Sequence, residues 1–138
     1  MNKLKALRLK IGKWILDKSS RSNNPQSLEH PNSFLFLRQD GKIGDYIVSS
    51  FVFREIKKFN PLIKIGVICT KQNAYLFQRN HNIDEIYLVK KRNILDYIKT
   101  ALFIRKERYD VVIDPTLVLR NRDLLLLRIL NARNYIGY

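Results

Sequence analysis

The sequence places an acidic residue, Asp45, where a carboxylate could act as a general base on a hydroxyl group. Asp45 ends the stretch RQDGKIGD (38–45), which follows the apolar run FLFL and precedes a segment with helical periodicity. Glycines at 41 and 44 would let the backbone turn tightly and let a ligand come close, but their spacing fits neither the dinucleotide-binding nor the P-loop pattern. A carboxylate in the first turn of a helix is also favoured by the helix dipole, so the pattern alone favours helix capping over catalysis.

Three basic residues could contact an anionic ligand close to Asp45. Arg120 and Arg122 follow a predicted strand in the segment LVLRNRD, and Lys42 lies in the RQDGKIGD loop. A guanidinium group suits phosphate through paired hydrogen bonds, and a positive charge at a helix start is otherwise mildly unfavourable. Two interpretations stay open for these residues: phosphate contacts, or solvated side chains.

Neither a metal centre nor a disulfide is predicted. The single cysteine, Cys69, cannot form an intrachain disulfide, and its place at the end of the run IKIGVIC indicates a buried thiol. His30 and His81 stand far apart, without a cysteine or an acid at ligand spacing.

The length and charge of the chain suggest one basic domain. A chain of 138 residues is long enough for one ordinary domain, and its apolar residues fall in blocks too short to cross a bilayer, which predicts a soluble protein. The net charge of +14 indicates an anionic partner: nucleic acid, an acidic membrane surface or a phosphorylated substrate.

The first 19 residues are predicted to form a basic amphipathic helix, because Leu4, Leu7, Ile11 and Ile15 recur at helical spacing. This helix could lie on anionic lipid, or its apolar side could pack on the domain or on a partner. Residues 20–32 have the composition of a linker, so the domain is predicted to span 33–138. The residues expected to face a membrane are Lys3, Lys5, Arg8, Lys10, Lys13 and Trp14.

From residue 33 onward, apolar blocks suited to strands alternate with helical periodicities. This order predicts an α/β fold: a Rossmann-like parallel sheet with helices on both faces. We expect the stripe of Ile47, Val48, Phe51, Val52, Ile56 and Phe59 to mark one of these helices, over 46–59. The other expected helices are 71–80, 94–102 and 123–130, and the expected strands are 34–37, 62–68, 85–89 and 110–114, with a further strand starting in the final YIGY.

Several of these segments, in collinear order, resemble the N-terminal half of the ADP-heptose:lipopolysaccharide heptosyltransferases, glycosyltransferase family nine. The resemblance covers residues 33–138 and is carried by FLFLRQDGKIGDYIVSSFVFREIKKFNP, IKIGVIC, NIDEIYLV and YDVVIDPTLVLRNRDLLLLRILNARNYIGY. Gly44 and Asp45 match the family's Gly-Asp signature at the head of the first helix, whose aspartate is held to be the catalytic base. Arg38 departs from the family pattern, because it stands seven residues before the aspartate rather than six.

The resemblance implies the N-terminal half of a two-domain GT-B enzyme that transfers a sugar with inversion, without a metal or another cofactor. This half would bind the lipopolysaccharide core acceptor, with Gly44, Lys42, Arg120 and Arg122 near its anionic groups and Asp45 as general base. The donor, ADP-heptose, would bind only to a C-terminal half that these residues do not include, so we expect the chain alone to be inactive. The implied location is the cytoplasm, peripheral on the inner face of the cytoplasmic membrane.

Two other functions remain open from the sequence. The chain could be a membrane-associated binding module without catalysis, or a basic nucleic-acid-binding domain. The second is disfavoured, and no nucleic-acid partner is expected, because the aromatic residues fall mostly within apolar blocks and no RNA- or DNA-binding signature is present.

Overall fold

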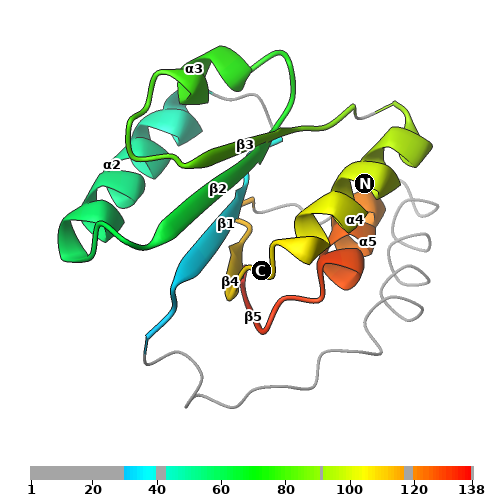
Figure 1. Cartoon of the computed structure of the whole chain (residues 1–138). Helices are drawn as coiled ribbons and strands as arrows, with labels where there is room; N and C mark the ends of the chain where they lie inside the picture. The colour runs from blue at the N-terminus through cyan, green and yellow to red at the C-terminus, as the bar shows by residue number, and fades with distance from the viewer. Residues whose placement is uncertain (1–29, 40–42, 91, 117–119, 138) are drawn as a thin grey trace.

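The computed structural model describes residues 30–39, 43–90, 92–116 and 120–137 (Figure 1). Strands and helices alternate along the chain, as the sequence predicted. Their order is β1 (Ser33–Leu37), α2 (Ile43–Phe59), β2 (Lys64–Cys69), α3 (Ala74–Gln78), β3 (Glu85–Leu88), α4 (Ile94–Lys106), β4 (Val111–Ile113), α5 (Asn121–Leu130) and β5 (Asn134–Ile136). The helix predicted over residues 1–19 and most of the predicted linker lie outside the described residues.

The five strands form one parallel sheet in the order β3-β2-β1-β4-β5. The central strand β1 pairs with β2 on one side, through Phe34 and Ile65, and with β4 on the other, through Phe34 and Val111. The chain adds strands outward from β1 in one direction and then, after α4, in the other. The carboxyl ends of β1 and β4 therefore form the switch point at which open α/β sheets bind ligands.

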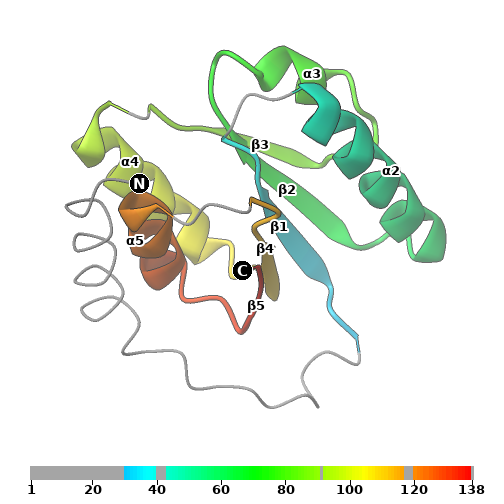
Figure 2. The ribbon, with the colours of Figure 1, turned by 180° about the vertical axis from the view of Figure 1, so that it is seen from behind.

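Two helical layers cover the sheet, α2 and α3 on one face and α4 and α5 on the other (Figure 2). Side chains alternate along β1: Leu35 and Leu37 join the core beneath α4 and α5, whereas Phe36 joins the core beneath α2 and α3. The strand is apolar on both faces because helices cover both, which confirms the predicted Rossmann-like architecture. No helix in the described part of the chain is long and apolar enough to span a membrane.

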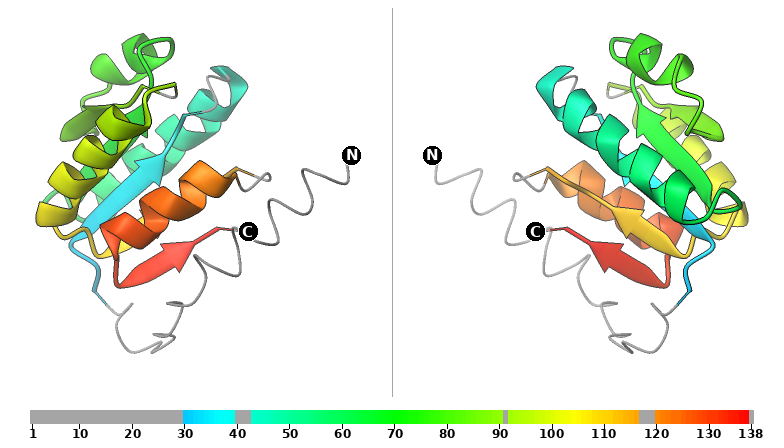
Figure 3. Two further views of the ribbon diagram at one scale, coloured as in Figure 1. Left: turned by 90° about the vertical axis from the view of Figure 1, so that its right-hand side faces the viewer. Right: turned by 90° about the vertical axis from the view of Figure 1, so that its left-hand side faces the viewer.

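The buried face of α2 is not the apolar stripe that marked this helix in the sequence. Its sheet-facing side is made by Ser49 and Phe53, with Tyr46 and Ile56 packed beside them. The stripe predicted from the sequence lies mostly outward, because α2 rests over β1 and β2 and nothing in the described chain covers its other side (Figure 3). Of the six stripe residues only Ile56 packs against this core; Ile47, Val48, Phe51, Val52 and Phe59 are exposed.

Candidate active site at the carboxyl edge of the sheet

Asp45 lies at the switch point, as the third residue of α2. The helix begins at Ile43, so Asp45 stands inside the first turn and not at the N-cap, where the helix dipole still favours a carboxylate. Its side chain is 45% exposed, and Oδ2 lies 3.8 Å from Nη2 of Arg38. The carboxylate is thus held beside a positive charge and stays accessible to a ligand.

The partner in this ion pair, Arg38, is almost completely buried, at 3% exposure. It follows the last residue of β1, and its N–H extends the sheet ladder by donating to the carbonyl of Ile68 at 2.8 Å. The additional loop residue between Arg38 and Asp45 does not prevent the two side chains from meeting. A buried guanidinium group is costly unless charges and acceptors surround it, and the Asp45 carboxylate is one such charge. The backbone that carries this group receives support from two neighbouring elements.

Asn73 supplies part of this support from the loop after β2. Its Nδ2 donates to the carbonyl of Arg38 at 2.7 Å, and its Oδ1 accepts from the N–H and the hydroxyl of Thr70, both at 2.9 Å. Asn73 occupies the N-cap position of α3, yet its side chain makes no capping hydrogen bond there. The amide instead links the end of β2 to the end of β1.

Tyr97 supplies the other part from α4. Its hydroxyl lies 2.9 Å from Nε2 and 3.2 Å from Oε1 of Gln39, in a buried contact between residues 58 positions apart. Burial raises the pKa of the Tyr97 hydroxyl, so that the group stays protonated and can serve as both donor and acceptor. The dipeptide Arg38-Gln39 is therefore fixed from α3 on one side and from α4 on the other.

The loop after β4 and the start of α5 form the other half of the candidate site, at the same carboxyl edge of the sheet as Asp45. Arg120 is the exposed N-cap residue of α5, with extended backbone and no side-chain capping bond. Arg122 is partly buried, and its Nε lies 3.7 Å from Oδ1 of Asp123. Burial raises the pKa of Asp123, an effect that Arg122 opposes and Asp114 reinforces. Asp114 shapes the loop, because its Oδ1 accepts from the N–H and the hydroxyl of Thr116.

The remaining predicted residues divide into those the structure describes and those it does not. Gly44 is exposed, and a Cβ added there would meet nothing within 4 Å, so packing does not require a glycine at this position. Lys42 and the residues predicted to face a membrane lie outside the described residues. In the described part of the chain no group of three or more His, Cys, Asp or Glu side chains could hold a metal ion.

The sequence did not indicate the residues that hold the site together. Gln39, Asn73 and Tyr97 act through hydrogen bonds between distant segments, for which no local pattern exists. Asn73 directly before the apolar AYLF carried a helix-start signal, but its actual partners are Thr70 and Arg38.

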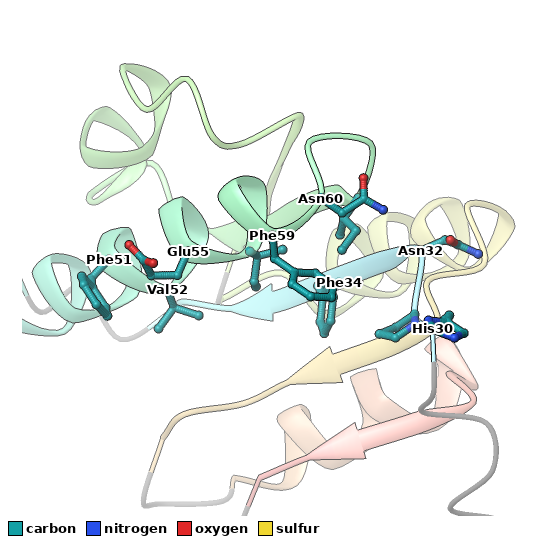
Figure 4. Close-up of a pocket in the computed structure, with 11 residues that line it drawn as sticks. His30, Asn32, Phe34, Phe51, Val52, Glu55, Phe59 and Asn60 are labelled. Atoms are coloured by element: carbon teal, nitrogen blue, oxygen red, sulfur yellow. The ribbon is translucent and has the colours of Figure 1, made fainter.

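A cavity of about 370 Å³ lies at the other end of β1, against the last turns of α2 (Figure 4). Its walls are mainly apolar, with Phe34, Val52 and Phe59 among the lining residues. Since β1 runs from this cavity towards Arg38, the cavity and Asp45 lie at opposite edges of the sheet. The cavity is therefore a separate feature from the candidate active site.

The strand order and the two helical layers define a Rossmann-like domain, and comparisons with known proteins agree with this fold. Over 83 residues, 60% of this chain, the sequence is 26% identical to a protein of Escherichia coli K12 named "Putative lipopolysaccharide heptosyltransferase 4", of which the match covers 23%. A crystal structure of a glycosyl transferase family 9 protein from Veillonella parvula superimposes with a TM-score of 0.64 at 20% identity, over 75% of this chain and 31% of that one. No protein-family model matches the chain.

These comparisons bear out the resemblance to glycosyltransferase family nine that the collinear motifs indicated, and the crystal structure confirms the fold. The chain spans less than a third of the length of either relative.

Proposed function

We propose that this chain is the acceptor-binding part of a heptosyltransferase-like glycosyltransferase, with Asp45 as general base. The observation that carries the proposal is the accessible Asp45 carboxylate, placed at the switch point beside a buried Arg38 in a fold shared with a glycosyltransferase family 9 protein. An inverting transfer needs a base that takes the proton from the acceptor hydroxyl while that oxygen attacks the sugar. The departing diphosphate needs positive charge or N–H dipoles as it leaves.

The acceptor side of this reaction suits the described residues. Arg120 and Arg122 lie at the start of α5, on the same edge as Asp45, and could bind phosphate groups of a lipopolysaccharide core while Asp45 faces its hydroxyl. The donor, a nucleotide-sugar such as ADP-heptose, would bind a second domain. Without that domain no donor sugar is held beside the acceptor hydroxyl, so we expect no transfer by this chain alone.

We also propose a location on the cytoplasmic face of the inner membrane, held there by charge. The net charge of +14 suits an anionic surface, and the basic residues of 1–19 would add to the attraction. Nucleic-acid binding is less well supported, because the sequence carries no RNA- or DNA-binding signature.

Acceptor binding can be measured with the 138-residue chain as it exists. In an NMR titration with a deacylated, phosphorylated lipopolysaccharide core, we expect shifts at Arg38, Asp45, Arg120 and Arg122. Removing a charged contact costs about 1.5–3 kcal/mol, so Arg122→Ala should weaken binding about ten- to hundredfold. Arg105→Ala, in the last turn of α4 at the opposite edge, is the matched control and should leave affinity unchanged.

Dephosphorylated core should bind much more weakly than the phosphorylated form. Equal affinity for the phosphorylated and the dephosphorylated core would refute the acceptor site. Resonance shifts on another surface of the domain would refute it as well. The role of Asp45 is tested separately, in the longest reading frame that contains this chain: Asp45→Asn should abolish transfer from ADP-heptose and leave acceptor binding intact. Turnover retained by that variant would exclude the base assignment and favour a binding module without catalysis.

A further inference from the structure

Helix α2 carries an apolar surface that no other element in the described part of the chain covers. This outer stripe consists of Ile43, Ile47, Val48, Phe51, Val52 and Phe59, all exposed. The exposed fraction is 68% at Val48 and reaches 86% at Phe59. Since the opposite side of α2 already packs on β1 and β2, the first half of the helix is apolar around most of its circumference. A helix of this kind is normally covered on both sides.

The outer stripe continues into the 370 Å³ cavity, which adds depth to the surface. Phe51, Val52 and Phe59 line the cavity from α2, and Phe34 lines it from the start of β1 (Figure 4). On the face of the sheet that carries α2, no described helix lies above β4 and β5 (Figure 3). The stripe and the cavity together form one apolar surface about as long as α2, which at 17 residues measures about 26 Å, and the cavity hollows this surface into a groove between Phe51 and Phe59.

The chain itself leads into this groove. His30 and Pro31, the first described residues, are part of the cavity lining. Residues 20–29 precede them, and ten residues can span up to about 33 Å, so a segment tethered by them can reach any point along α2.

The segment at the far end of this tether has a matching pattern. Leu4, Leu7, Ile11 and Ile15 repeat at helical spacing, with lysines and arginines on the remaining sides. As a helix, 19 residues would measure about 28 Å, close to the length of α2. Neither the apolar residues of this segment nor the outer stripe has a role in the proposed transfer reaction.

We propose that residues 1–19 form a helix that docks on the outer stripe of α2, with Leu7, Ile11 and Ile15 facing the groove. The lysines and Arg8 then point outward and stay free to approach an anionic surface. The docked segment covers the apolar groove, so the helix binds this domain through its apolar side and does not insert that side into lipid. The inference does not depend on the proposed transferase function.

The only tryptophan of the chain, Trp14, lies in this segment beside the apolar residues and reports on docking in the full-length protein. In wild type we expect blue-shifted emission and poor quenching by acrylamide. Phe51→Asp and Val52→Asp change exposed residues, so the fold should persist, which the circular dichroism spectrum checks. Each substitution should shift Trp14 emission to the red and raise the quenching constant several-fold.

The matched control is Leu102→Asp, which makes the same kind of apolar-to-acidic change at an exposed residue of α4, on the other face of the sheet. It should leave the Trp14 signal unchanged. A red shift caused by Leu102→Asp and not by Phe51→Asp would overturn the proposal, because the segment would then lie on α4. Emission that is already red-shifted in wild type and becomes blue-shifted only with anionic vesicles would also overturn it, in favour of lipid insertion. An emission that changes with protein concentration would mean that a second copy covers the stripe, which overturns the proposal as well.

A positive readout comes from crosslinking. A disulfide needs Cα atoms within about 7 Å, so Ile11→Cys combined with Phe51→Cys or Val52→Cys should oxidise to an intrachain disulfide in at least one pair. Cys69 does not compete, because it is buried and burial raises the pKa of its thiol to about 12. Failure of both pairs to crosslink, while Ile11→Cys crosslinks to Leu102→Cys, would again refute docking on α2.

Discussion

Replacing Asn73 by aspartate tests whether this side chain fixes the Arg38 backbone at the candidate site. The substitution keeps Oδ1, which accepts from the N–H and hydroxyl of Thr70, and removes only the Nδ2 donor to the Arg38 carbonyl. The wild-type amide is 4% exposed. A carboxylate there leaves the buried carbonyl unsatisfied, which costs about 1–3 kcal/mol, and adds the cost of burying a charge. We expect Asn73→Asp to lower the unfolding free energy by about 2–4 kcal/mol at pH 7.

The pH dependence of this effect identifies its cause. We expect burial to raise the pKa of the new carboxyl group above its value in the unfolded chain, so that the folded state of the variant would bind the proton more tightly. Once protonated, the group can donate to the Arg38 carbonyl as the amide did. The destabilisation of Asn73→Asp should therefore shrink as pH falls through the raised pKa. Asn73→Ala loses all three hydrogen bonds, about 3 kcal/mol at roughly 1 kcal/mol each, at every pH.

The assay is urea unfolding followed by circular dichroism between pH 4 and pH 8, with Asn82→Ala as control. Asn82 is also partly buried, but its amide donates within one turn, to Asn80 at 3.1 Å, so its loss should cost under about 1 kcal/mol. Asn73→Asp could lower the unfolding free energy no more than Asn82→Ala does, or by an amount that does not change with pH. Either result would mean that the contact between Asn73 and the Arg38 carbonyl does not stabilise this edge.

Three further predictions concern single groups. Gly66→Ala should destabilise by about 1–3 kcal/mol in urea unfolding, because its Cβ would collide with the buried hydroxyl of Tyr109. Burial raises the pKa of Asp123 above 3.8, so the folded state holds this proton more tightly than the unfolded chain does. The unfolding free energy of the wild type, measured relative to Asp123→Asn, should therefore fall as pH rises through the raised pKa and stay lower above it. Cys69, with its pKa raised to about 12 by burial, should resist iodoacetamide at pH 8 in the folded chain and react on unfolding in urea.

The sheet could be predicted from the sequence because its strands are apolar on both faces and are separated by helical segments. FLFL proved to be the central strand, paired on both sides, and Asp45 proved to lie in the first turn of the following helix. Both features depend on residues close together in the sequence. Boundaries moved by a few residues, as for α2, which begins at Ile43 and not at Tyr46.

The support of the candidate site could not be predicted, for a different reason. Asn73 binds the Arg38 backbone across 35 residues and Tyr97 binds Gln39 across 58. In the sequence Asn73 looks like a helix cap and Tyr97 like one more apolar position of α4. Their roles depend on the order of the strands, which brings the ends of β1 and β2 together, and no periodicity encodes that order.

The buried face of α2 could not be told from the sequence, because the helix carries apolar residues on two sides. Phe53 and Ile56 meet the sheet, while Val48, Phe51 and Val52 point away from it. A helix that packs on one sheet needs only one apolar side, so the second side is a surplus that sheet packing does not explain. Exposed apolar area of this extent on a helix generally marks a contact surface. The surplus was present in the sequence before any coordinates, and it indicates that α2 has a second partner besides the sheet.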